Sequence, residues 1–211
     1  MVGCNALTVQ KIKEHIDKKN LTVTQDSVKN EICERISNNL MNMAPKKIGT
    51  ILEKIVRAEF SIDVNGHINA ENDGLCQVST IEIKSSRAMF ETDSDKKASL
   101  YSFVANYQRG LVSLADLETS NFVCNIQQVK PKLFNRLYYV LLVKEGLLIF
   151  KIANNQIVND SNITYSNKQH RGNTDEGQFH IKKSNINYHI ETYYDRMIGW
   201  ERIIDILQTL N

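Results

Sequence analysis

Residues 81–86 read Ile-Glu-Ile-Lys-Ser-Ser, a short run in which apolar β-branched residues alternate with charged ones. Successive side chains of a β-strand point to opposite faces. Ile81 and Ile83 can therefore enter a core. Glu82 and Lys84 then stand together on the other face, so the run predicts a strand that presents a carboxylate and an ammonium side by side.

Asp73 and Gly74 precede this run and supply a second carboxylate. Hydrolysis of a phosphodiester needs a hard cation held by carboxylates, an activated water and a positive group near the charge that develops on phosphorus. Asp73, Glu82 and Lys84 can supply the protein groups for this chemistry. The pattern therefore indicates a metal-dependent nuclease site.

The chain has 211 residues, of which 42% are apolar, enough to bury one substantial core. We expect one domain. The longest apolar stretches, 137–143 and 147–152, are shorter than the roughly 20 residues that a membrane helix needs. With no export signal evident at the N-terminus, the sequence predicts a cytoplasmic protein without membrane association. The cysteines lack zinc-ligand spacing and are expected to be reduced, buried and structural: Cys4, Cys33, Cys76 and Cys124.

Helical spacing of apolar residues predicts two amphipathic helices before residue 41 and a third that begins at Pro45 and ends near Phe60. Asn65-Gly66 predicts a hairpin turn between two short strands at 61–64 and 67–72, and Asp73-Gly74 a second turn before a third strand at 78–86. Further along, the patterns predict a helix at 100–114, a central hairpin of strands 136–143 and 147–153, a second hairpin of strands 178–182 and 187–191, and a final helix at 193–210. These elements predict an α/β fold with a mixed central sheet flanked by helices.

The order of these elements, with Asp73 nine positions before Glu82 and Glu-x-Lys on the third strand, resembles the PD-(D/E)xK nuclease family. Two sequence segments resemble those of type II restriction endonucleases: Glu-Ile-Lys-Ser-Ser-Arg at 82–87 and Gln-Gln-Val-Lys-Pro-Lys-Leu-Phe at 127–134. The resemblance covers about residues 46–153. It implies a restriction-endonuclease-like catalytic core at 46–153 within a single nuclease domain, 1–211. An N-terminal helical elaboration would occupy 1–45, and recognition and C-terminal elements 154–211.

The resemblance also implies roles for individual residues. Asp73 and Glu82 would hold Mg²⁺, for which Mn²⁺ would substitute, together with the backbone carbonyl of Ile83. Lys84 would orient the attacking water and stabilise charge on phosphorus, since an ordinary lysine is a poor free base. Glu53, on the preceding helix, would add a further carboxylate to the metal site.

Other interpretations of the same residues remain open. The family's usual proline is absent before Asp73, where Asn72 stands, so Asp73 could be an ordinary turn residue. Asp63 is then the reserve choice for the first acid, and Glu71 a weaker one. Glu82 and Lys84 could also belong to a solvated strand face. Glu53 could lie on a solvated helix face, and Gln108 could either look into the cleft or lie on the surface.

Two segments carry side chains suited to DNA. Gln128, Lys130 and Lys132 surround Pro131, where they could contact phosphates or base edges. A second segment concentrates the groups that read guanine and adenine, and predicts a recognition loop with its following strand: Lys168, Gln169, His170, Arg171, Asn173, Gln178 and His180. For both segments, the alternative is a polar surface loop with no partner.

The sequence thus predicts an endonuclease that cuts both strands of double-stranded DNA at a short specific site. Symmetric cleavage of a palindrome predicts a twofold homodimer, with helices at 8–41 and the final helix around Trp200 as candidate interfaces. Two alternatives are a repair or recombination nuclease of the same fold and a DNA-binding module without catalysis. The net charge of +2 is compatible with all three.

Overall fold

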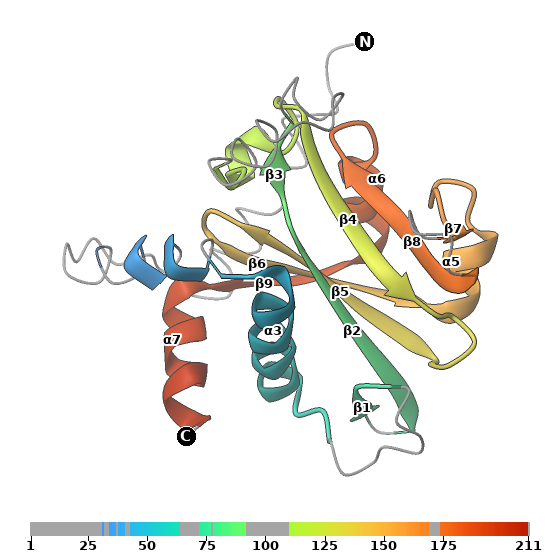
Figure 1. Cartoon of the computed structure of the whole chain (residues 1–211), viewed down its shortest axis with the longest axis horizontal. Coiled ribbons are helices and arrows are strands. Elements are labelled where there is room, and N and C mark those ends of the chain that lie inside the picture. Colours follow the sequence, from blue (N-terminus) through green and yellow to red (C-terminus); the bar gives the residue numbers. More distant parts are fainter. Residues whose placement is uncertain are drawn as a thin grey trace.

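A computed structural model gives the architecture of the chain (Figure 1). It describes residues 31, 34–36, 38–40, 43–63, 72–76, 78–91, 110–168 and 174–210. Within these ranges the protein is an α/β structure with a mixed sheet flanked by helices, as the sequence predicts. Several predicted features lie outside the described residues, namely the first helix, the Asn65-Gly66 turn and most of the helix expected at 100–114.

The larger sheet has five strands in the order β1-β2-β5-β6-β9. β2 runs parallel to β5, and the other neighbours are antiparallel, so the sheet is mixed. The apolar run predicted to form the central hairpin does form β5 and β6, with a turn at Lys144 and Glu145. The strands are β1 (Gly74–Cys76), β2 (Ser79–Arg87), β5 (Arg136–Val143), β6 (Gly146–Ala153) and β9 (Tyr194–Gly199).

A second sheet has the order β3-β4-β8-β7. The chain passes from β2 into β3 through the buried Ala88, whose N–H donates to the Leu142 carbonyl at 3.0 Å. β2 and β3 therefore form one long path that links the two sheets (Figure 1). The strands are β3 (Met89–Phe90), β4 (Phe122–Val129), β7 (Ser166–Lys168) and β8 (Thr174–Lys182).

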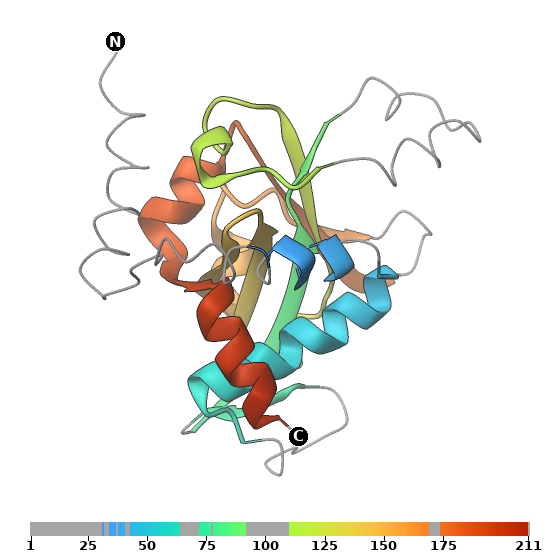
Figure 2. The same ribbon diagram turned by 90° about the vertical axis from the view of Figure 1, so that its left-hand side faces the viewer.

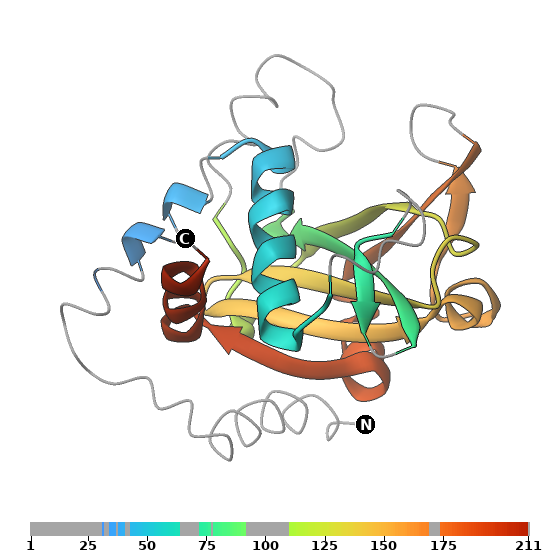
Figure 3. The same cartoon turned by 90° about the horizontal axis from the view of Figure 1, so that it is seen from below.

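Helices α3 (Pro45–Phe60) and α7 (Trp200–Thr209) lie side by side on one face of the larger sheet (Figures 2 and 3). Proline suits the first turn of α3 because that position needs no N–H donor. Apolar residues three or four apart then place one stripe of α3 in the core. This stripe packs with the inward side chains of β2: Ile48, Leu52, Ile55, Ile81 and Ile83.

The other face of the larger sheet packs against β4, β8 and α6 (Ile186–Tyr193), which form the second core. Tyr139, Phe150 and Phe179 are among its largest fully buried side chains. Their rings stack or meet edge to face. Two short helical segments complete the described part of the fold, a 3₁₀ turn (Leu114–Asp116) and α5 (Asn154–Asn159). The site discussed below therefore sits on a strand held between two hydrophobic cores.

Several boundaries correct the sequence interpretation. Asp73-Gly74 is not the turn before β2, because Gly74 already begins β1 and the turn into β2 includes Val78. Residues 187–191, expected as a strand, belong to α6. The predicted final helix starts late because 194–199 form the edge strand β9. Leu111 bridges to Met89 instead of continuing a helix.

Other expectations are met only in part. Cys124 is a buried free thiol, whereas Cys76 is half-buried, and the other two cysteines lie outside the described residues. Trp200 is buried and donates its indole N–H to the Lys144 carbonyl at 2.7 Å, so its side chain belongs to the core of this chain. None of the helices in the described ranges is long and apolar enough to cross a membrane.

Candidate active site

Glu82 and Lys84 lie on β2 and form an ion pair with each other. In the antiparallel register of β1 and β2, Gly74 stands opposite Ile81. Asp73 immediately precedes Gly74, so this pairing brings Asp73 beside the residues that follow Ile81. The three residues predicted from the sequence are therefore brought to one place by strand pairing.

Two hydrogen bonds fix Asp73 against β2. Its backbone N–H donates to the Ile81 carbonyl at 2.8 Å. Its side-chain Oδ2 accepts the N–H of Ile83 at 2.6 Å. Since Ile83 lies between Glu82 and Lys84 in the chain, this second bond holds the Asp73 carboxylate beside both.

Helix α3 brings a further acid and a cation to the same place. Arg57 forms an ion pair with Glu53 one turn before it, and its guanidinium also reaches Asp73 Oδ1 at 3.5 Å. All three side chains are largely shielded from solvent. Two carboxylates thus share one guanidinium, which offsets the repulsion between them.

Burial raises the pKa of Glu82 from 4.5 to about 7. The Lys84 ammonium opposes this shift, while the negative charges of Asp73 and Glu53 add to it. Desolvation penalises the charged form of a carboxyl group, and a nearby like charge does the same. Asp73, Glu53 and Glu82 are three carboxyl groups, whereas the site has two cations, Arg57 and Lys84. Fully ionised, the acids would therefore carry more negative charge than these cations neutralise.

One oxygen of Glu82, Oε2, is buried and has no hydrogen-bond partner among the described residues. Such an atom normally requires a partner, because its desolvation is otherwise uncompensated. A hard cation would provide one, with the Asp73 carboxylate and the Ile83 carbonyl as further oxygen ligands. The donor set fits Mg²⁺ in chemical type.

As the side chains stand, no group of three or more His, Cys, Asp or Glu within the described ranges converges to hold a metal ion. The contacts give the reason. Glu53 and Asp73 are turned toward Arg57, and Glu82 toward Lys84. Each of these acids is already paired with a cationic side chain in this arrangement, so a metal ion would compete with Arg57 and Lys84 for the same oxygens.

The reserve choices for the first acid are less well placed. Asp63 pairs through its backbone with Leu75, at 2.9 Å in both directions, and its side chain is exposed. The charge of Asp73, by contrast, contributes to the raised pKa of Glu82. Glu71 and Gln108 lie outside the described residues. Of the two acids that the structure describes, Asp73 has the better geometry.

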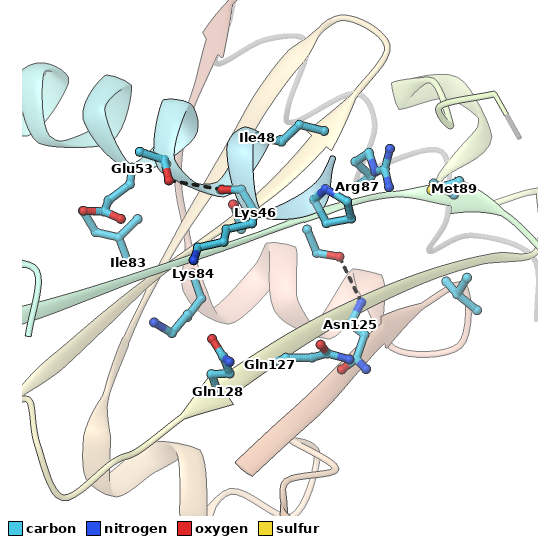
Figure 4. A pocket seen from close by; sticks show the side chains of 16 residues that line it. Lys46, Ile48, Glu53, Ile83, Lys84, Arg87, Met89, Asn125, Gln127 and Gln128 are labelled. Carbon is cyan, nitrogen blue, oxygen red and sulfur yellow. Dashed lines mark hydrogen bonds between the residues drawn. The ribbon is translucent and has the colours of Figure 1, made fainter. Parts of the chain in front are cut away.

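A cleft of about 710 Å³ opens beside this site (Figure 4). α3 and β2 form one side, and β4 forms the other. Lys84 reaches it from β2 and Glu53 from α3, and Gln127 and Gln128 face them from β4. Two more cations, Lys46 and Arg87, also line it. Cationic side chains and amides in one cleft suit a nucleic-acid backbone with exposed base edges.

The predicted DNA-contacting residues are dispersed. Gln128 lines the cleft, whereas Lys130 pairs with Glu176 at 3.1 Å and Lys132 is exposed in the following turn. His180 lines a different cavity, of about 540 Å³, beside Lys182.

The predicted recognition segment is described only in part. Lys168 is exposed on β7. Gln178 is 6% exposed and its amide is engaged inside the protein, so it does not present an edge to solvent. The rest of that segment lies outside the described residues: Gln169, His170, Arg171 and Asn173.

Sequence reasoning missed Arg57, which lies four positions after Glu53 and so on the same helix face. It also missed β4, in which the buried Phe122, Cys124 and Ile126 alternate with less buried residues as a half-buried strand requires. Unless β4 is recognised, nothing in the sequence places Asn125 or Gln127 near β2.

Comparison with models of known protein families, with curated proteins and with solved structures finds no match to this chain. The function proposed below therefore depends on the geometry of the site.

Proposed function

We propose that this protein is a Mg²⁺-dependent, sequence-specific endonuclease that hydrolyses phosphodiester bonds in double-stranded DNA, built on a PD-(D/E)xK core like that of type II restriction endonucleases. The observation that carries this proposal is the hydrogen bond from the Ile83 N–H to Asp73. It joins an acid from one strand to the Glu-x-Lys pair of the next, beside a cleft lined with cations.

Asp73, Glu82 and the Ile83 carbonyl would hold Mg²⁺, with Glu53 contributing directly or through water. The ion would supply positive charge to the phosphate oxygens and lower the pKa of a bound water. Burial and the negative charges of Asp73 and Glu53 raise the pKa of Glu82, and a divalent cation bound among these acids would favour the ionised carboxylate.

Lys84 has two contributions in this scheme. Its ammonium pairs with Glu82, so it stands within reach of any group that the acid binds. It donates hydrogen bonds that orient the attacking water, and its charge stabilises the phosphorane oxygens as the transition state forms. Arg57 holds Glu53 and Asp73 in place around the same point.

A twofold homodimer is part of the proposal, because one chain carries one such site and a palindrome has two scissile bonds. The exposed surface of α7 and the segment before residue 41 are the candidate interfaces. The core position of Trp200 excludes its indole from this role.

The test is digestion of unmodified plasmid DNA by the purified protein with Mg²⁺ or Mn²⁺, followed by sequencing of the fragment ends. We expect discrete fragments with a common end sequence. Asp73→Asn keeps an acceptor for the Ile83 N–H and should abolish cleavage, whereas Asp63→Asn, the matched control, should leave it unchanged. Absence of cleavage by the parent protein would support a binding module, and ends without a common sequence would support a repair or recombination nuclease.

A further inference from the structure

The outer side of β4 carries three amide side chains into the cleft: Asn125, Gln127 and Gln128. β4 runs antiparallel to the path formed by β2 and β3, with Met89 opposite Val123. Further back along this path, Ser86 accepts the Asn125 backbone N–H at 3.2 Å. The amides thus lie alongside the part of β2 that carries Lys84 (Figure 4).

A β-bulge brings the third amide to the surface. Phe122, Cys124 and Ile126 point into the core, so Gln128 would follow them in a regular strand. Instead the register shifts between Gln127 and Val129, and Gln128 adopts a φ of 58°. Both glutamines are exposed, and Val129 is fully buried in the core.

This backbone conformation is unfavourable for a residue other than glycine. Gln128 is one of two such residues, with Ser61 at the end of α3, in the part of the chain that the structure describes. Strained positions are often retained at functional sites. Here the strain turns a second glutamine toward the cleft, next to its neighbour.

Asn125 is held in a fixed orientation by a buried neighbour. Its Nδ2 donates to Gln178 Oε1 at 3.0 Å, and Gln178 Nε2 in turn donates to the Lys168 carbonyl at 3.4 Å. This arrangement leaves Asn125 Oδ1 buried without a hydrogen-bond partner within the described ranges. An acceptor held in this way at the wall of a cleft suits an N–H donor on a ligand.

We infer that Asn125, Gln127 and Gln128 read base edges of the DNA bound in this cleft and select an A·T pair next to the cleaved phosphate. The amide of glutamine matches the N6 donor and N7 acceptor of adenine, and Asn125 Oδ1 can accept from an amino group of a base. Lys46, which lines the same cleft, would contact a phosphate, and such a contact positions the duplex without specifying sequence. The inference rests on the proposed function for its ligand, duplex DNA.

The experiment selects binding sites and does not depend on cleavage. A pool of randomised duplexes is bound to Lys84→Ala protein in Mg²⁺, and the retained DNA is sequenced. The same selection is run with Gln128→Ala, Gln128→Gly or Asn125→Ala added. Asn155→Ala, which removes an exposed amide on α5 away from the cleft, is the matched control. Gln128→Gly removes the amide while tolerating the bulge conformation, so it separates recognition from folding.

We expect the Lys84→Ala protein to enrich a short site that contains an A·T pair. Either Gln128 variant should reduce the enrichment of that pair on the order of tenfold, while Asn155→Ala changes nothing. The inference is overturned if the Lys84→Ala protein enriches no sequence. It is also overturned if the variants with an added β4 substitution select the same site as Lys84→Ala alone. If the A·T preference depends on Gln128 but the wild-type protein cuts no plasmid, the inference stands and the nuclease function fails. If the wild-type protein cuts at a site whose selection the β4 variants leave unchanged, the nuclease function stands and the inference fails.

Discussion

The Asp73 carboxylate accepts the backbone N–H of Ile83 at 2.6 Å. This bond ties the residue that precedes the three-residue edge strand β1 to the centre of β2. It places two acids side by side that are nine positions apart in the chain, at a point where the register of β1 and β2 already brings them together. The position of Asp73 therefore depends on β1 keeping its path.

Gly74 makes that path possible. Its φ is 147°, and an added Cβ would lie 2.7 Å from the Asp63 carbonyl oxygen. We expect Gly74→Ala to lower the free energy of unfolding by about 1–3 kcal/mol and to reduce DNA cleavage at least tenfold, because Asp73 moves with β1.

Gly199→Ala is the matched control, since Gly199 has a φ of −72° and its Cβ would meet nothing within 4 Å. Urea unfolding and plasmid digestion of both variants test this prediction. Equal effects of the two substitutions would show that β1 does not position the acid.

Glu82 should lower the stability of the protein as pH rises. Its folded pKa is about 7 and its ordinary value 4.5, so between these values the folded state binds more protons than the unfolded state. The contribution of Glu82 to stability therefore falls by up to about 3 kcal/mol across this window. Glu82→Gln should be more stable than wild type at pH 8, by about 1–2 kcal/mol after loss of the Lys84 ion pair, and inactive.

Denaturant unfolding of wild type and Glu82→Gln at pH 5 and pH 8, without metal, checks this expectation. The advantage of the variant should shrink toward pH 5, where the wild-type carboxyl is protonated in the folded state. A variant that is less stable than wild type at pH 8 would contradict the assigned burial and charge of Glu82.

His189, in contrast to Glu82, should lower the stability of the protein as pH falls. Its side chain is fully buried among aromatic rings, and Nδ1 shares a hydrogen bond of 2.8 Å with the Tyr139 hydroxyl. Burial lowers the pKa of His189 from 6.5 to about 4, against the opposing charge of Asp160. Between these values the unfolded state then binds more protons than the folded state. The contribution of His189 to the free energy of unfolding is therefore complete above pH 6.5 and is lost as pH falls to 4.

The size of this effect is up to about 3 kcal/mol. His189→Phe keeps an aromatic ring but cannot titrate, so the loss of stability between pH 6.5 and pH 4.5 should be smaller in this variant than in wild type. The pH slope is the readout, because the lost Tyr139 contact lowers stability at every pH. An unchanged slope would mean that His189 titrates normally.

Arg57 should hold Glu53 and Asp73 in place at the site. Arg57→Met keeps an unbranched side chain but leaves Glu53 and Asp73 without their shared cation. We expect a loss of about 1–2 kcal/mol in stability and cleavage of DNA slowed at least about tenfold, because both acids lose the group that orients them. Arg202→Met, which breaks a more exposed pair with Glu59, is the control and should lower stability by less than about 1 kcal/mol. Cleavage by Arg57→Met at the wild-type rate would contradict this role.

The alternation at 81–84 and the apolar hairpin at 136–153 predict β2, β5 and β6 because burial there dominates local preference. Residues 187–191 mislead because a strand-like alternation coincides with helical spacing. Ile186, His189, Ile190 and Tyr193 are buried three or four positions apart, as in α6. The helical spacing becomes evident only over 186–193, which is longer than the five residues that resemble a strand.

The sequence likewise predicts only the part of the candidate site that follows from a local pattern. Glu82 and Lys84 are neighbours in sequence, and their shared face follows from strand period alone. The contacts of Asp73 with Ile83 and Arg57 depend on strand register and on the packing of α3, which no local pattern encodes. The proximity of the β4 amides to Lys84 depends likewise on how two sheets are joined.

The nuclease function is best tested by comparing wild type with Lys84→Ala for two properties in parallel, Mg²⁺-dependent cleavage of plasmid DNA and binding of duplex DNA. Lys144→Ala, an exposed lysine in the β5–β6 turn, is the control. We predict discrete fragments from wild type and Lys144→Ala, at least a hundredfold slower cleavage by Lys84→Ala, and similar DNA affinity for all three. Cleavage by Lys84→Ala at the wild-type rate, or no cleavage by wild type with Mg²⁺ or Mn²⁺, would show that this site does not hydrolyse DNA as proposed.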